Sequence, residues 1–325
     1  MRRLAITCLA TALLAGCGMD DSDPLQVTDQ LTAAQPAPAP RDTPPAAGTV
    51  RPAPAIQHTA YDTSTDTLLT TSGNTLTVRS PNTDQQRTVD LAAPPANLRT
   101  ENGRALLALP DADTVTRVDL RTGDTTDTHV PGGPLDAVDL GPGRLATAQR
   151  DTRDVTVREH GQPRATADEF DEPARLLTTG GDLNVLDRLT TSLTPVDPAT
   201  GDKGAGLRAG AGATNAVTDR YGRILTIDTR GGELLAFSTD PLIMKQRYPV
   251  PGSPYGLAYD PNRDIAWTTL TDTNELVGYD IAGGQPEERH RIPTVSQPDS
   301  VTVDPATGRI YVASANGAGL QVVTP

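Results

Sequence analysis

A segment of about 40 residues recurs seven times along the chain, and this repeat constrains the fold more than any other feature. The clearest copy, Ser253 to Gly284, has three short apolar runs separated by turns. Aligned at one position of the first run, successive copies start 39 to 44 residues apart, and the starts are Ile56, Pro95, Pro134, Pro173, Ala213, Pro254 and Pro298. A unit this small cannot bury both faces of its sheet alone, so the copies must stack on one another.

The order of strands and turns within each copy predicts the architecture. A second and a third apolar run follow the first, and residues typical of hairpin turns separate them, as at Asn102-Gly103 and Thr307-Gly308. No helix-length apolar periodicity appears after Gly16. Seven four-stranded units with a period near 40 therefore predict an all-β fold, a seven-bladed β-propeller spanning residues 49–325.

The two ends of the propeller segment are predicted to pair. The last repeat has only three strands before the chain stops at Pro325, whereas Gly48 to Arg51 form a short extended segment without a blade of its own. If this N-terminal strand pairs with Leu320 to Val323, it completes the last blade and removes an open sheet edge.

Two repeats carry residues that indicate a family. The segment Asp304 to Ser314, DPATGRIYVAS, and more loosely Asp260 to Tyr279, resemble the YVTN-type (YncE-like) repeat. That resemblance implies a seven-bladed propeller. The Gly-His and Trp-Asp pairs of WD40 repeats are absent from the sequence.

The N-terminus is predicted to direct export. Residues 1–16 combine a basic start with a short apolar segment, which is typical of a signal peptide. The run Leu14-Ala15-Gly16-Cys17 resembles the lipobox of bacterial lipoproteins, which implies that Cys17 is acylated and anchors the protein to the outer face of the cytoplasmic membrane. An ordinary signal peptide with a chance cysteine is the alternative, and Arg2-Arg3 leaves both the Sec and the twin-arginine export routes open.

Between the lipidation site and the propeller, residues 17–48 are rich in proline and alanine and have no apolar periodicity, so they are predicted to form a disordered tether. The formal net charge of −13 opposes binding to nucleic acid, because the long-range field repels phosphates. We expect the protein to be a monomer.

A ring of polar residues is predicted at the mouth of the central channel, where the inner strands of a propeller begin. The second residue after each repeat start is in turn His58, Asn97, Asp136, Arg175, Asn215, Gly256 and Ser300. The simplest interpretation is contact with channel water. The functional interpretation is a ligand site formed by the six members with polar side chains.

No cofactor is expected, although calcium is an alternative at this mouth. Propellers resembling the SMP-30 lactonases bind a divalent cation, and Asn97, Asp136 and Asn215 offer oxygen ligands of the kind that Ca²⁺ accepts. Against this, the ring holds a single carboxylate. Histidines of the kind that streptogramin B lyases use are not clustered in the sequence, and no nucleophile, zinc or phosphate-loop motif occurs.

The sequence therefore favours a non-catalytic lipoprotein that presents the propeller as a binding or scaffolding platform for a protein, a peptide or a cell-wall ligand. The alternative is a metal-dependent hydrolase or lactonase with its site at the channel mouth.

Overall fold

The computed structural model describes residues 31–83 and 85–325. The signal peptide, Cys17 and the first part of the tether lie outside these residues. The compact unit Thr32–Pro325 is described below.

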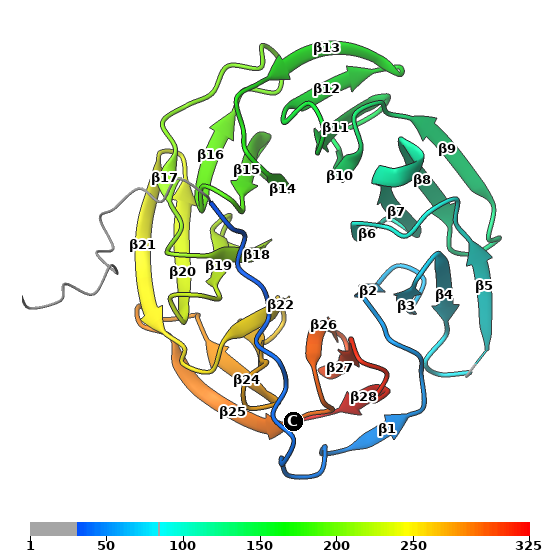
Figure 1. The fold of residues 1–325 in the computed structure, drawn as a ribbon, viewed down its shortest axis with the longest axis vertical. Coiled ribbons are helices and arrows are strands. Elements are labelled where there is room, and N and C mark those ends of the chain that lie inside the picture. The colour runs from blue at the N-terminus through cyan, green and yellow to red at the C-terminus, as the bar shows by residue number, and fades with distance from the viewer. Residues whose placement is uncertain (1–30, 84) are drawn as a thin grey trace, which may run out of the picture. The chain divides into compact units, whose positions relative to one another are not determined.

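Seven antiparallel sheets of four strands each surround a central opening in this unit (Figure 1). This arrangement is the predicted seven-bladed propeller. The first strand of each blade lines the opening, and the last lies on the outside.

The first three blades are built from consecutive strands. They are β2 (His58–Asp62), β3 (Thr67–Ser72), β4 (Thr75–Arg79) and β5 (Gln86–Asp90); β6 (Asn97–Glu101), β7 (Arg104–Leu109), β8 (Thr114–Asp119) and β9 (Thr125–His129); and β10 (Pro134–Asp139), β11 (Arg144–Gln149), β12 (Val155–Glu159) and β13 (Gln162–Ala167). A 3₁₀ turn, Pro110–Ala112, is the only helical element among the described residues.

Blades four to six follow the same order, and the seventh takes one strand from the N-terminal side. They are β14 (Pro173–Thr179), β15 (Asp182–Asp187), β16 (Ser192–Val196) and β17 (Leu207–Arg208); β18 (Ala213–Thr218), β19 (Ile224–Asp228), β20 (Glu233–Thr239) and β21 (Leu242–Pro249); β22 (Pro254–Asp260), β23 (Ile265–Leu270), β24 (Glu275–Asp280) and β25 (Glu287–Pro293); and β26 (Pro298–Asp304), β27 (Arg309–Ser314), β28 (Leu320–Val323) and β1 (Thr49–Arg51).

The predicted closure of the ring is confirmed. Strand β1 pairs antiparallel with β28, with Thr49 opposite Val322 and Arg51 opposite Leu320. Gly48, just before β1, has φ +71°, and a Cβ there would lie 2.3 Å from the carbonyl oxygen of Val322. Only glycine allows the chain to approach the last blade this closely.

The core consists of apolar layers between neighbouring blades. One cluster joins blades one and two around Leu69 and Leu107, and another joins blades five and six around Ile227 and Val277. Because each sheet packs on both faces, its strands read as continuous apolar runs. Trp267 and Tyr279 are among the largest fully buried side chains.

Each inner strand of blades three to seven contains a bulge near its first residue, as between Pro134 and Asp136 in β10. A bulge turns the side chain beside it and locally increases the twist of the strand. These bulges lie at the mouth of the channel, next to the predicted polar ring.

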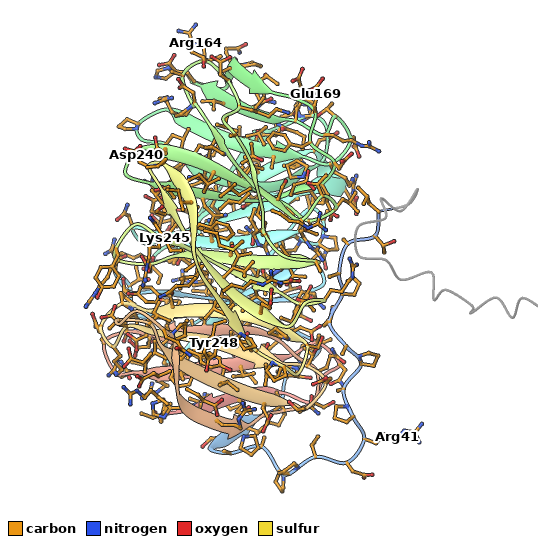
Figure 2. The ribbon with its side chains drawn as sticks, turned by 90° about the vertical axis from the view of Figure 1, so that its left-hand side faces the viewer. Arg41, Arg164, Glu169, Asp240, Lys245 and Tyr248 are labelled. Atoms are coloured by element: carbon orange, nitrogen blue, oxygen red, sulfur yellow. The ribbon has the colours of Figure 1, made fainter. Side chains whose placement is uncertain are left out.

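The structure differs from the expectation of a disordered tether in residues 32–48. Residues 32–40, called the strap below, lie along one face of the ring, and the edge-on view shows the segment that carries Arg41 following that face (Figure 2). Beyond the strap, the amide of Ala47 donates to the carbonyl of Pro293 and Gln321 Nε2 donates to the carbonyl of Ala47. The composition predicted disorder because the strap has no apolar periodicity. In the structure, the main chain of the strap forms hydrogen bonds with side chains of the blades.

In the part of the chain that the structure describes, no helix has the length and apolar character needed to cross a membrane.

Candidate functional site

A cavity of about 680 Å³ occupies the central channel. It is lined by inner strands of blades one, two and four to seven, and six members of the predicted ring face it: His58, Asn97, Arg175, Asn215, Gly256 and Ser300. The seventh, Asp136, lies behind the wall and is only 1% exposed. The structure thus brings the predicted residues together at the mouth.

The polar members of the ring bond each blade to the next. His58 Nε2 lies 3.1 Å from the carbonyl oxygen of Pro95, and Asn97 Nδ2 donates to Asp136. Further along, Arg175 Nη2 donates to Asn215 Oδ1 at 3.0 Å, and Asn215 Nδ2 donates to the carbonyl of the next blade at 2.8 Å. Hydrogen bonding between blades therefore accounts for much of the polarity that the sequence showed at these positions.

The ring closes between the seventh and first blades, where Ser300 Oγ accepts from the amide of Thr59 at 2.9 Å. Between the sixth and seventh blades the corresponding residue is Gly256. A Cβ there would lie 3.2 Å from the carbonyl oxygen of Asp299, so the glycine lets these two blades approach.

Asp136 is the most heavily bonded member of the ring. Its Oδ1 accepts from Asn97, from Arg99 Nε at 2.9 Å and from the amide of Ala137 at 2.8 Å, while its Oδ2 accepts from Arg99 Nη2 and from the amide of Leu176 at 2.7 Å. Burial alone would raise the pKa of this carboxyl, but the Arg99 guanidinium and the hydrogen bonds hold the pKa below its usual value. Asp136 is thus an ionised group that joins three blades.

These contacts bear directly on the calcium alternative. A cation at this point would have to displace the Arg99 guanidinium and two backbone amides from Asp136, and Asn215 Oδ1 already accepts from Arg175. The donor set therefore does not fit a Ca²⁺ site in this arrangement. Among the described residues, no three His, Cys, Asp or Glu side chains cluster as metal ligands.

His58 presents a neutral ring to the channel. Burial and the nearby charge of Arg175 lower the pKa of His58 to about 4. Because its Nε2 faces a carbonyl oxygen, that nitrogen carries the proton and Nδ1 keeps its lone pair.

Three arginines line the cavity, and two of them are paired. Arg99 binds Asp136, and Arg220 binds Asp264. Among the described residues no carboxylate lies within ion-pair distance of Arg175, whose guanidinium also approaches the carbonyl of Ala174 at 3.5 Å. Burial lowers the pKa of Arg175, partly offset by the charge of Asp136. Its remaining donors are available to a ligand.

The sequence did not single out Asp299, which also lines the cavity. Its Oδ1 accepts from Gln297 Nε2 at 2.9 Å, and no cationic side chain of residues 31–83 or 85–325 forms an ion pair with it. Burial raises the pKa of the Asp299 carboxyl to about 6. The one sequence signal for Asp299 was its position next to Pro298, the predicted start of the last repeat, and the bulge of β26 lies at this point.

A second candidate surface lies under the strap. Four side chains, one from each of blades four to seven, hold it, and all of their hydrogen bonds to the strap end on its main chain. Arg230 Nη2 donates to the carbonyl of Thr32 and Arg188 Nη2 to that of Ala34, each at 2.7 Å. Thr271 Oγ1 accepts from the amide of Ala37 at 2.9 Å.

Gln297 completes this surface. Its side-chain amide donates to the carbonyl of Ala37 and accepts from the amide of Ala39, each at 3.0 Å, as a neighbouring strand would. Ala34 is 5% exposed and packs where Gly212 leaves room, since a Cβ on that glycine would lie 2.7 Å from the Cβ of Ala34. The four side chains Arg188, Arg230, Thr271 and Gln297 are called the strap groove below.

Comparison with known proteins identifies the fold. No family model and no curated protein matches the sequence. Among solved structures, hydrazine synthase from Kuenenia stuttgartiensis is similar over 88% of this chain and 98% of that chain, with 14% identity and a TM-score of 0.71. A streptogramin B lyase covers 84% of this chain and 94% of its own, with 13% identity and a TM-score of 0.67.

The C-terminal WD40 domain of Sif2 is similar over 83% of this chain and 81% of its own, with 12% identity and a TM-score of 0.65. At these identities the likeness establishes a shared propeller fold and nothing about activity. The three proteins also differ widely in what their names describe, as expected of a fold that hosts many functions.

Proposed function

We propose that this chain is a bacterial lipoprotein with a YVTN-type (YncE-like) propeller, anchored through Cys17 to the outer face of the cytoplasmic membrane. The propeller is a non-catalytic platform that binds an extended segment of a partner polypeptide in the strap groove. The motivation for the anchor is the run Leu14 to Cys17.

One observation carries the binding function: the propeller already holds a proline-rich peptide, its own strap. The hydrogen bonds of the groove side chains to the strap all involve main-chain atoms of the strap. Recognition through the main chain tolerates changes of side chain, as in other modes by which proteins bind extended peptides. A partner segment with the same extended conformation can therefore use the same four side chains.

The strap acts as a competitor in this scheme. A tethered segment has an effective concentration of the order of millimolar at its own site, so a partner must bind more tightly or the strap must be drawn away. When no partner is bound, the strap of the same chain occupies the groove and accepts the hydrogen bonds of its two arginines. The metal-dependent hydrolase receives less support, because the oxygens it would need at Asp136 are bound to Arg99.

Binding of a labelled peptide tests the platform. The probe is a fluorescein-labelled synthetic copy of residues 31–41, LTAAQPAPAPR. In the variant Ala34→Arg the strap can no longer fit against Gly212, so the groove becomes free. We expect this variant to bind the probe at least about tenfold more tightly than the unaltered protein, measured by fluorescence anisotropy.

The matched control is Gln35→Arg, which places the same charge on the neighbouring, exposed strap residue. It should bind the probe as weakly as the unaltered protein. Adding Gln297→Ala to Ala34→Arg should reduce probe binding again, because the two hydrogen bonds that imitate a strand are lost. If Ala34→Arg binds the probe no better than Gln35→Arg, the groove is not a peptide site.

A further inference from the structure

The central cavity contains two opposite charges, Arg175 and Asp299, and neither forms a salt bridge with another described residue. Arg175 comes from β14 in the fourth blade and Asp299 from β26 in the seventh, and these strands begin on opposite sides of the central opening (Figure 1). The other two arginines of the cavity are paired with Asp136 and Asp264. The cavity wall therefore carries a positive charge on the side of the fourth blade and a negative charge on the side of the seventh.

Each of the two groups has bonding capacity left. The guanidinium of Arg175 uses one terminal nitrogen on Asn215, and its planar fork suits a carboxylate. Asp299 uses one oxygen on Gln297, and within the described part of the chain its second oxygen accepts no hydrogen bond. A buried charge without a partner is costly, so a ligand that neutralises it binds with a gain in free energy.

The two groups are well separated. The strands that carry them, β14 of the fourth blade and β26 of the seventh, begin on opposite sides of the central opening (Figure 1). A single α-amino acid, whose ammonium and carboxylate are neighbours, cannot span opposite walls. The ligand must therefore carry its two charges several bonds apart.

We propose that the central cavity binds a short linear peptide with free termini, whose carboxylate pairs with Arg175 and whose ammonium pairs with Asp299. The volume of about 680 Å³ falls in the range of about 300 to 1,000 Å³ found for pockets that bind small ligands. His58 Nδ1 and the phenol ring of Tyr255, both in the cavity wall, offer an acceptor and an aromatic surface to the middle of the peptide.

The cavity site and the strap groove would contact their ligands through different side chains. The groove recognises main-chain atoms of a long segment, whereas the cavity recognises the two ends of a short one. Neither Arg175 nor Asp299 bonds to the strap, although Gln297 Nε2 donates both to the carbonyl of Ala37 and to Asp299 Oδ1. The labelled strap peptide tests the platform and tri-alanine tests the cavity, so failure of one probe to bind does not decide the other proposal.

Isothermal titration of the full chain with tri-L-alanine tests the proposal without any substitution. Tri-alanine should bind, and acetylation of its N-terminus or amidation of its C-terminus should each lower the association constant at least about tenfold, because each removes one ion pair. Absence of binding at millimolar tri-alanine, or equal binding of the blocked peptides, would overturn the site.

Substitutions then show which end of the peptide each residue binds. Arg175→Gln should weaken tri-alanine binding about tenfold, and amidation of the peptide should then cause little further loss of affinity. Asp299→Asn should also weaken tri-alanine binding about tenfold, and acetylation of the peptide should then cause little further loss. The control is Arg220→Gln, which alters a cavity arginine already paired with Asp264 and should leave tri-alanine binding within about twofold. Equal losses in Arg175→Gln and Arg220→Gln would show that the ligand does not select Arg175.

Discussion

The Arg99 guanidinium donates hydrogen bonds to both carboxylate oxygens of Asp136 across the boundary between the second and third blades. The Asp136 side chain is 1% exposed and that of Arg99 is 28% exposed. The same carboxylate accepts the amide of Leu176 from the fourth blade. One ion pair therefore fixes the relative position of three inner strands. Asp136, which the sequence predicted to bind a ligand, thus holds neighbouring blades together in this structure.

Replacing Asp136 by Asn should destabilise the propeller strongly. The substitution keeps the shape of the side chain but leaves the Arg99 cation without a counter-charge, and the loss of one partner of a buried ion pair costs about 3 to 5 kcal/mol. Urea denaturation followed by circular dichroism measures the change. Glu159→Gln, which breaks the exposed pair with Arg164, is the control and should cost less than about 1 kcal/mol.

Closure of the ring can be tested at Gly48. Ala at this position suffers from the positive φ and from a contact with the carbonyl of Val322. Gly73 also has a positive φ, +55°, but a Cβ there meets nothing within 4 Å. We expect Gly48→Ala to lower the free energy of unfolding by about 1 to 3 kcal/mol more than Gly73→Ala does. Equal effects would mean that the approach of β1 to β28 does not support the fold.

The fold was predictable because it rests on the period of the repeat. Copies spaced 39 to 44 residues apart, with strands short enough to need neighbours, leave few architectures other than a propeller. The pairing of β1 with β28 was also predictable, since a last repeat with three strands needs a fourth. Local turn residues and apolar runs are sufficient signals for both.

The site was predictable only in part. The position of each residue along its inner strand predicted the ring of polar residues at the channel mouth. The hydrogen bonds between blades, such as that from Asn97 to Asp136, depend on how neighbouring blades are aligned in space, which the sequence does not show. Asp299 was missed because it lies one residue from the aligned position, and a bulge turns it into the cavity. The strap was missed because proline and alanine carry no periodicity, and its partners lie 150 or more residues away along the chain.

The lipid anchor makes a prediction at Cys17. Replacing this residue by Ala removes the thiol that would be acylated, so the protein should appear in the soluble fraction outside the cell, detected by immunoblotting of fractions. Two or three acyl chains hold a protein at a membrane far more firmly than one. Replacing Cys8, which lies in the predicted signal peptide, is the matched control and should leave the protein at the membrane. Membrane retention of Cys17→Ala would refute the anchor.

Asp299 should make stability depend on pH in a direction opposite to the usual one for a carboxylate. Its pKa is about 6 in the folded protein against 3.8 for a free carboxyl, so the folded state binds more protons between these values. The resulting stabilisation is fully present below about pH 4 and is lost as the pH rises through 6. Asp299→Asn carries no charge at any pH and should exceed the unaltered protein in stability by about 1 to 2 kcal/mol at pH 7.5 and by little at pH 4.

His58 gives the opposite slope and so provides the internal check. Its pKa of about 4 in the folded protein lies below the usual 6.5, so the unfolded chain binds more protons between these values and stability falls as the pH drops from about 6.5 to 4. In His58→Asn this loss disappears, and the variant should gain on the unaltered protein toward low pH, whereas Asp299→Asn gains toward high pH. Urea titrations at pH 4, 5, 6 and 7.5 measure both differences. Parallel pH profiles for the two variants would show that these groups are not buried in the channel wall as the structure places them.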